Sequence, residues 1–274
     1  MTLVFLQSGA LSYLMKTSNI PVIFSFIILV LAASSPVLAA DAPQPGNTSN
    51  DSFSESKKRL HKLVYGQAEH RITLYCGCKY DEKKQVDFTA CGYKPVKDNK
   101  RAHRIEWEHA VPAEAFGQSF KEWRDGSTGC VDKKGKTFKG RKCAEKENLE
   151  FRFMQADMFD LFPAVGEVNG LRSNYSMAMI PGNTYRFGAC KTKIEDQKIE
   201  PRPEVRGLIA RTYFYMDRAY PGHGIISGKN QKLFEAWDKA DPVNAWECER
   251  GRRITKLQGN VNQVVDKACK AAGL

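Results

Sequence analysis

The apolar residues of this chain recur mainly at the spacing of amphipathic helices. In residues 205–220 the apolar side chains fall three or four positions apart and would line one face, and the pattern stops at Pro221-Gly222. Residues 52–65 show similar spacing behind two serines that suit an N-cap. The helices predicted in this way cover residues 52–65, 114–123, 148–162, 205–220 and 231–239.

Strand patterns are fewer and shorter. The candidates are residues 71–75, 104–109 and 185–193, where apolar and polar side chains alternate or β-favouring residues cluster. The pair Asn169-Gly170 indicates a turn, and the tail from Trp246 onward is expected to be irregular and held by cysteines. This mixture predicts an α+β fold with more helix than strand.

Residues 1–39 predict a signal peptide. Lys16 is the only charged residue before Asp41, residues 20–31 are almost wholly apolar, and small residues mark a cleavage site after Ala39 or Ala40. An uncleaved membrane anchor is the alternative. No other stretch is apolar enough to cross a bilayer, so we expect the mature chain to be exported and free of the membrane.

The mature chain is expected to form one domain. Residues 40–51 are rich in Pro, Gly, Ser and Asn and predict a flexible linker. Residues 52–274 are long enough to bury one substantial core, and a single domain is the usual outcome at this length.

All eight cysteines follow the signal peptide, and an even number in an exported chain predicts four disulfides. A zinc site is the competing interpretation. It is disfavoured because a single residue separates Cys76 from Cys78, whereas zinc pairs are usually two to four residues apart. One local pairing, Cys130 with Cys143, is predicted because it would close a loop rich in lysine and glycine.

The chain is strongly basic, with a net charge of +11 at pH 7 and an isoelectric point near 9.2. Such a charge on an exported protein favours anionic partners, namely nucleic acid, phospholipid or anionic polysaccharide, over a basic surface that serves only solubility. The loop between Cys130 and Cys143 concentrates the charge, with Lys133, Lys134, Lys136, Lys139, Arg141 and Lys142.

The densest candidate chemistry lies in Glu106-Trp107-Glu108-His109. In a strand the two carboxylates would share one face. A carboxylate can hold a hard cation, and a neutral imidazole beside it can take a proton from water. The alternative is a solvated strand end with one surface histidine. Asn169 is similarly open to two interpretations, a turn residue or an amide ligand for the metal.

Several motifs in order along the chain resemble the bacterial periplasmic or secreted endonuclease I family. They are Tyr75-Cys76-Gly77-Cys78, the run from Glu106 to Ala113, Gly140-Arg141-Lys142-Cys143, the run from Pro163 to Gly170, Ile209-Ala210-Arg211-Thr212-Tyr213 and Trp246-Glu247-Cys248. The chain departs from this resemblance at Met158-Phe159-Asp160-Leu161, where many members have Leu-His-Asn-Leu.

The resemblance implies a ββα-metal nuclease core that holds one divalent cation. By this resemblance His109 is the general base, Glu108 and Asn169 are the metal ligands, and Arg141 binds the phosphate. Glu106 is similar to a carboxylate that lies beside the site and reaches the metal through water. One carboxylate and one amide oxygen suit Mg²⁺, which keeps several of its waters, and Ca²⁺ or Mn²⁺ could take its place.

We therefore expect an exported, Mg²⁺-dependent, sequence-nonspecific endonuclease, monomeric and either periplasmic or secreted. Its expected substrates are duplex and single-stranded DNA, with RNA as a second substrate, and its activity should require the disulfides. A basic exported protein that binds nucleic acid without cutting it is the alternative. A disulfide-bonded phospholipase or other hydrolase ranks lower because the sequence has neither Gly-x-Ser-x-Gly nor His-Glu-x-x-His.

Overall fold

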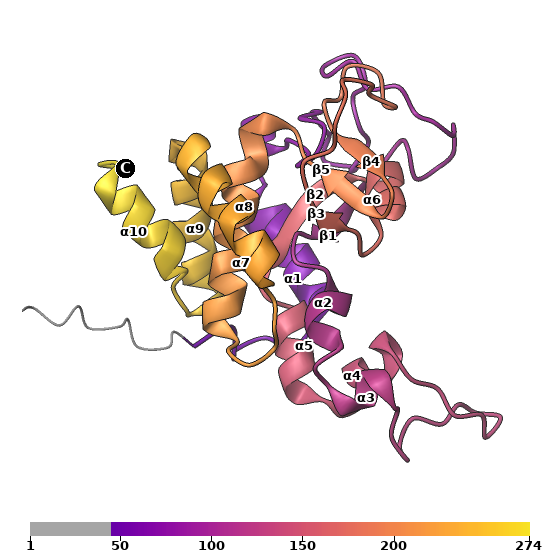
Figure 1. Cartoon of the computed structure of the whole chain (residues 1–274). Coiled ribbons are helices and arrows are strands. Elements are labelled where there is room, and N and C mark those ends of the chain that lie inside the picture. The colour runs from indigo at the N-terminus through magenta and orange to yellow at the C-terminus, as the bar shows by residue number, and fades with distance from the viewer. Residues whose placement is uncertain (1–44) are drawn as a thin grey trace, which may run out of the picture. The chain divides into compact units, whose positions relative to one another are not determined.

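The computed structural model describes residues 45–274, and its elements are labelled in Figure 1. The predicted signal peptide and the first residues of the predicted linker lie outside this range. Across residues 45–274, none of the helices combines the length and the apolar character that a membrane span requires.

Two antiparallel strands and the helix that follows them form the centre of the fold. Strand β1 (Ile105–His109) pairs with β2 (Leu161–Val165), so that Glu106 lies opposite Ala164 and His109 opposite Leu161. Helix α6 (Gly166–Arg172) begins directly after β2 and contacts both strands. This is the ββα arrangement that the family resemblance implies, although more than fifty residues of other structure separate its two strands.

The remaining helices form two groups (Figure 1). The N-terminal group is α1 (Phe53–Arg59), which continues into the π-helical turn η1 (Leu60–Val64), then α2 (Ala113–Gly117), α3 (Lys121–Arg124), α4 (Arg141–Glu147) and α5 (Leu149–Gln155). The C-terminal group is α7 (Arg206–Ala219), α8 (Gly228–Ala240), α9 (Ala245–Gln258) and α10 (Gln263–Ala271). The 3₁₀ turns are η2 (Ala68–His70), η3 (Met158–Asp160) and η4 (Pro203–Val205).

A second, three-stranded sheet has the order β3 (Ser176–Met177), β5 (Lys198–Glu200), β4 (Lys193–Glu195), with β3 parallel and β4 antiparallel to β5. The strands predicted over 71–75 and 185–193 are wrong. Both segments are pinned by Cys76–Cys190, and the first turns at Gly77, whose φ of +66° favours glycine. Isolated bridges, such as Ile72 with Lys79, take the place of a ladder.

The long helix predicted over 148–162 ends early. Helix α5 stops at Gln155, the buried Asp157 turns the chain by accepting a hydrogen bond from the Phe159 amide, and β2 starts at Leu161. All five residues of β2 are buried, and a continuous apolar run of this kind has no period that separates a strand from a helix. The predicted helix over 114–123 is likewise two short helices, α2 and α3.

The predicted turn at Asn169-Gly170 is also wrong, because both residues belong to α6. Tertiary packing overrides the local signal: Val168 is fully buried, and a Cβ on Gly170 would lie 2.4 Å from Nη1 of Arg101. The two glycines of α6 therefore let this helix lie close against Arg101 and β1.

The C-terminal tail is helical rather than irregular. Asn244 and Asn262 cap α9 and α10 with their side chains, and Gly259 ends α9 in the left-handed region with a φ of +91°. The disulfide Cys248–Cys269 joins the two helices. These capping residues are visible in the sequence, and they mark the starts of two helices that were not predicted.

Four disulfides are present among the described residues, as predicted: Cys76–Cys190, Cys78–Cys91, Cys130–Cys143 and Cys248–Cys269. The local prediction of Cys130 with Cys143 is confirmed. That bridge joins the start of the lysine-rich loop to α4. The two ends of the loop are therefore held close together.

The described part of the predicted linker packs against the domain. Asn47 is 1% exposed; its backbone amide donates to Tyr220 Oη at 2.7 Å, and its side-chain amide donates to the Phe153 carbonyl at 2.9 Å. Ser49 Oγ donates to the Gln258 carbonyl at 2.5 Å. Residues 47–50 therefore contact α5, α9 and Tyr220, the residue that follows α7. A composition rich in turn-forming residues does not reveal these contacts.

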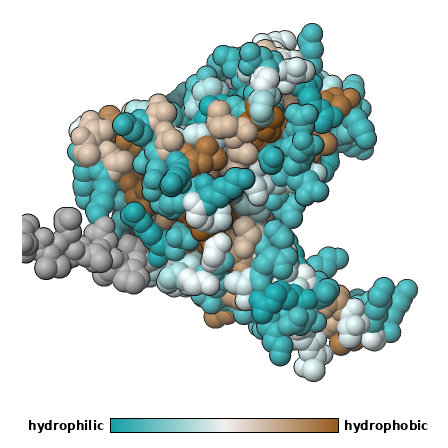
Figure 2. Space-filling view, viewed as in Figure 1, coloured by the Kyte–Doolittle hydropathy of each residue, from teal (hydrophilic) through white to brown (hydrophobic). Residues whose placement is uncertain are grey.

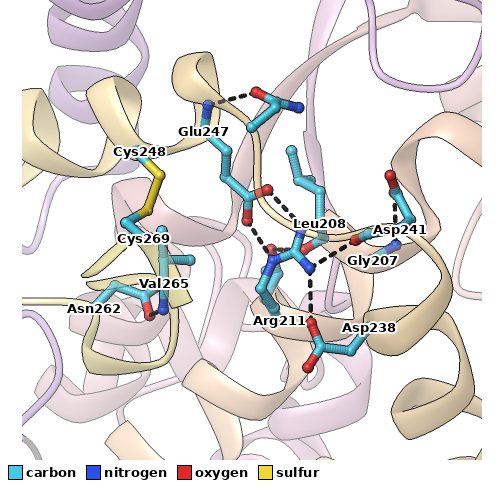
Figure 3. Close-up of polar contacts among 12 residues, drawn as sticks. Gly207, Leu208, Arg211, Asp238, Asp241, Glu247, Cys248, Asn262, Val265 and Cys269 are labelled. Carbon is cyan, nitrogen blue, oxygen red and sulfur yellow. Dashed lines mark hydrogen bonds and ion pairs between the residues drawn. A yellow bond between two sulfur atoms is a disulfide. The ribbon is translucent and has the colours of Figure 1, made fainter. Parts of the chain in front are cut away.

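A buried ion cluster ties the C-terminal helices together (Figure 3). Arg211 of α7 makes two hydrogen bonds to the carboxylate of Glu247 on α9, at 2.7 and 2.6 Å. Its remaining Nη1 donates to Asp238 Oδ1 on α8 at 2.7 Å and to the Asp241 carbonyl at 2.8 Å. Arg211 and Glu247 are 1% and 3% exposed, so each charge depends on its partner.

Replacing Arg211 by methionine should lower the free energy of unfolding by about 3–5 kcal/mol, because Glu247 would remain buried without a counter-charge. Urea denaturation of the oxidised protein measures this change. The matched control is Arg252→Met on α9, whose arginine is exposed and pairs with Glu249 on the same helix; it should cost less than about 1 kcal/mol. Equal losses of unfolding free energy in the two variants would show that the buried ion pair stabilises the protein no more than the exposed pair.

Candidate active site

The residues predicted to perform chemistry meet around one pocket of about 390 Å³. β1 supplies Glu108 and His109, α4 supplies Arg141 and α6 supplies Asn169. The full lining is Phe53, Trp107, Glu108, His109, Pro112, Ala113, Glu114, Trp123, Arg141, Asn169, Arg172, Ser173 and Asn174. Glu106, the fifth predicted residue, lies beside this pocket rather than in its lining.

Glu108 is held by one oxygen only. Its Oε1 accepts hydrogen bonds from the Tyr75 hydroxyl at 2.7 Å and from Arg172 Nη1 at 2.8 Å, and the side chain is almost fully buried. Burial raises the pKa of Glu108, and Arg172 and the Tyr75 hydroxyl act in the opposite direction. Among the described residues Oε2 has no protein partner, so this oxygen is available to a cation.

His109 is fixed in one tautomer. Its Nε2 lies 2.9 Å from the backbone carbonyl of Gln155, and because a carbonyl can only accept, Nε2 carries the hydrogen. Within residues 45–274 nothing hydrogen-bonds Nδ1, which keeps its lone pair. Burial and the nearby Arg141 lower the pKa of His109 to about 3, so the imidazole is neutral at neutral pH. The ring packs against Phe53 with 4.8 Å between centroids.

Asn169 and Glu106 are coupled. The Asn169 side-chain amide donates to Glu106 Oε2 at 3.4 Å, and since a carboxylate can only accept, the amide oxygen of Asn169 must point elsewhere. Glu106 also makes a bidentate pair with Arg101, at 3.0 and 2.6 Å, and contacts Arg104 at 3.3 Å. The arginines therefore orient Glu106, and Glu106 orients Asn169.

Arg141 lies at the first turn of α4, at the end of the lysine-rich loop. Its Nε and Nη2 donate to the side-chain oxygen of Gln155 at 3.3 and 3.2 Å. Gln155 thus contacts both His109, through its backbone, and Arg141, through its side chain. Because this partner is neutral, the charge of Arg141 remains available to an anion in the pocket.

The donor set fits a hard divalent cation. Glu108 Oε2 and the Asn169 side-chain oxygen are both free of protein partners in the described structure, and both residues line the pocket. One carboxylate and one amide oxygen would leave most positions of Mg²⁺ to water and to a substrate phosphate, which is how Mg²⁺ is commonly bound. The residues present therefore fit such an ion.

Basic residues lie near the pocket along the chain. Phe53 of α1, Trp123 of α3 and Arg141 of α4 line the pocket. The loop between α3 and α4 carries the exposed Lys133, Lys134, Lys136 and Lys139. Figure 2 shows mainly hydrophilic residues over this loop and a surface that is hollowed beside it. This loop therefore offers several positive charges to an anion that binds in the pocket.

Sequence reasoning missed the residues that orient the site. Arg172, which is 1% exposed, donates to Glu108 and also to the backbone carbonyls of His109 and Ala110, at 2.8 and 2.7 Å. Tyr75 also donates a hydrogen bond to Glu108, and Gln155 accepts hydrogen bonds from His109 and Arg141. Arg172 lies three residues after Asn169, so a helix predicted over this segment would have placed the two side chains on one face. Nothing in the sequence distinguishes Gln155.

Asp160, one of the departures from the family motif, should make stability depend on pH. Its Oδ1 accepts from the Val111 amide at 2.7 Å, its Oδ2 has no partner among residues 45–274, and burial raises the pKa of Asp160 well above the usual value. The folded state therefore favours the protonated form, so the contribution of Asp160 to stability is present below pH 4 and is lost as pH rises through the raised pKa.

The variant Asp160→Asn imitates the protonated form and should be more stable than the natural chain, by a margin that grows from pH 4 towards pH 8. Each unit of pKa shift corresponds to about 1.4 kcal/mol. Thermal melting across this range measures the margin. A constant difference between the two proteins at all pH values would contradict the assignment.

Comparison with known proteins agrees with this geometry. Residues 47–269 match the family model described as Endonuclease I. An extracellular deoxyribonuclease of Aeromonas hydrophila is 43% identical over 225 residues, 80% of this chain and 90% of the relative. A periplasmic deoxyribonuclease of the same organism is 41% identical over 88% of this chain and 93% of the relative. Endonuclease-1 of Buchnera aphidicola is 40% identical over 77% of this chain and 78% of the relative. On this match and on these relatives, the chain is a member of the Endonuclease I family.

Proposed function

We propose that this protein is an exported, metal-dependent endonuclease that hydrolyses DNA without sequence specificity, with His109 as general base. The observation that supports this most strongly is the state of His109. Its Nε2 donates to the Gln155 carbonyl, and its Nδ1 has no partner within residues 45–274. It lies in one pocket with Glu108, Asn169 and Arg141. A neutral, oriented imidazole beside hard-ion ligands suits the activation of water.

In the proposed reaction, water attacks the phosphorus of a phosphodiester and its proton passes to Nδ1 of His109. The bond between phosphorus and the leaving sugar oxygen breaks, and solvent supplies the proton that this oxygen takes up. The hydrogen bond from Nε2 to Gln155 holds the ring during this transfer and stabilises the imidazolium that forms.

Glu108 and Asn169 would hold the cation. When bound, the cation would act as a Lewis acid and stabilise the negative charge that develops on the phosphate. Arg172 and Tyr75 fix Glu108, and Glu106 fixes Asn169, so the two ligands need little rearrangement. Arg141 can form two parallel hydrogen bonds to phosphate oxygens from its guanidinium. Its contact with a neutral amide is easily exchanged for a charged partner.

The substrate range follows from the surface. The exposed lysines of the loop between α3 and α4 would contact phosphates, which fix the position of the DNA but do not distinguish bases. We therefore propose duplex and single-stranded DNA as substrates and RNA as a second one. The names of the extracellular and periplasmic relatives and the four disulfides support export.

The test uses closed circular DNA, which has no ends. The purified, oxidised chain with Mg²⁺ should convert supercoiled plasmid to nicked and then fragmented DNA, and should also degrade circular single-stranded DNA. A salt-sensitive gel shift without any cleavage would instead support the alternative, a basic protein that binds nucleic acid. Degradation of linear DNA alone would contradict endonuclease action.

A further inference from the structure

One lysine of α1 differs from its neighbours in lacking a counter-charge. Lys58 and Arg59 both reach Glu55, at 3.9 and 3.1 Å. Lys57 is half-buried, yet within residues 45–274 its ammonium group makes neither an ion pair nor a hydrogen bond. A partly desolvated ammonium group without a partner is unfavourable unless a ligand supplies the anion.

Phe53 connects this lysine to the active site. Nζ of Lys57 lies 4.2 Å from the centroid of the Phe53 ring, and the guanidinium carbon of Arg141 lies 5.3 Å from the same centroid. The ring also packs against His109. Phe53 lines the pocket and Lys57 does not. The ammonium group of Lys57 therefore lies outside the pocket, against the Phe53 ring.

The surrounding charges repel one another. Burial, Arg141 and Lys84 all lower the pKa of Lys57, and Glu145 is the one nearby group that raises it. Arg141 itself is hydrogen-bonded to the neutral Gln155. Three cations thus lie together with little neutralisation, which favours the binding of more than one negative charge.

We propose that Lys57 binds a DNA backbone phosphate adjacent to the one that is cleaved, so that Arg141 and Lys57 hold consecutive phosphates on either side of Phe53. The inference rests on the proposed function for the identity of the substrate. It assigns Lys57 to binding and positioning of the DNA rather than to the chemical step.

The test compares Lys57→Met with Lys58→Met. Both remove one positive charge from the same helix, and methionine keeps the aliphatic stem that packs on Phe53. Lys57→Arg restores the charge. Binding of a duplex oligonucleotide is measured over a range of salt concentrations in the His109→Ala background, so that the DNA stays intact, and steady-state cleavage is measured in the otherwise natural protein.

Lys57→Met should weaken DNA binding and raise KM about fivefold, with kcat changed less than twofold, and should reduce the slope of log affinity against log salt by about 0.9. Lys58→Met should leave KM unchanged, and Lys57→Arg should recover most of the loss. Equal effects at positions 57 and 58 would overturn the proposal, as would a fall in kcat with KM and salt slope unchanged. The binding comparison holds even if the natural protein does not cleave DNA, so failure of the proposed function would be seen separately.

Discussion

Replacing His109 by alanine should reduce the rate of DNA cleavage by about 10²- to 10⁴-fold, the usual contribution of a general base, and should leave DNA binding within about twofold. Arg141 and the lysines of the loop before α4 remain in this variant, whereas no other described side chain offers a neutral, oriented proton acceptor beside Glu108. Initial rates on plasmid DNA at saturating Mg²⁺, with gel-shift affinities measured in parallel, separate the two effects.

His103→Ala is a suitable control. His103 lies outside the pocket, half exposed and paired with Asp98, so its loss should change neither rate nor affinity. Thermal melting should place both variants close to the natural protein. If His109→Ala retained more than about a tenth of the activity, water would have to be activated by another group, and the site proposed for the base would be incorrect.

The variant Glu108→Gln is expected to have the second-largest effect, a loss of more than about 100-fold in cleavage at fixed Mg²⁺. Glutamine has the same shape but removes the only carboxylate among the two proposed ligands. It also leaves Arg172 buried beside a neutral group, so the protein should be less stable by about 3–5 kcal/mol. Calorimetric titration with Mn²⁺ measures ion binding directly.

Two further variants separate ion binding from stability. Asn169→Ala removes the other proposed ligand without touching Arg172, and should raise the Mg²⁺ concentration needed for half-maximal cleavage. Glu114→Gln removes a second carboxylate that lines the same pocket and should change this concentration little. An unchanged Mg²⁺ requirement in both Glu108→Gln and Asn169→Ala would mean that the ion binds elsewhere.

The sequence predicted the parts of the site that lie close together along the chain. Glu108 and His109 are neighbours on a strand that was predicted, and the pairing of Cys130 with Cys143 followed from the short loop between them. Helix α7 was predicted within a residue at each end because its apolar face repeats for four turns.

What escaped prediction depends on contacts between distant segments. Gln155 holds His109 across 46 positions of sequence, and Arg172 holds Glu108 across 64. Neither contact has a local signature. Helix α6 forms although it contains two glycines and an Asn-Gly pair, because Arg172 and Val168 gain buried partners only in the helical conformation. Local propensity is a weak guide where packing decides the outcome.

The central claim is that a divalent cation and His109 act together on DNA. The most direct measurement adds Mg²⁺ to protein freed of metal by EDTA and follows nicking of supercoiled plasmid by the natural chain and by His109→Ala, side by side. We expect no nicking before Mg²⁺ is added, rapid nicking by the natural chain afterwards, and almost none by the variant at any Mg²⁺ concentration. Nicking in EDTA, or equal rates for the two proteins, would contradict this claim.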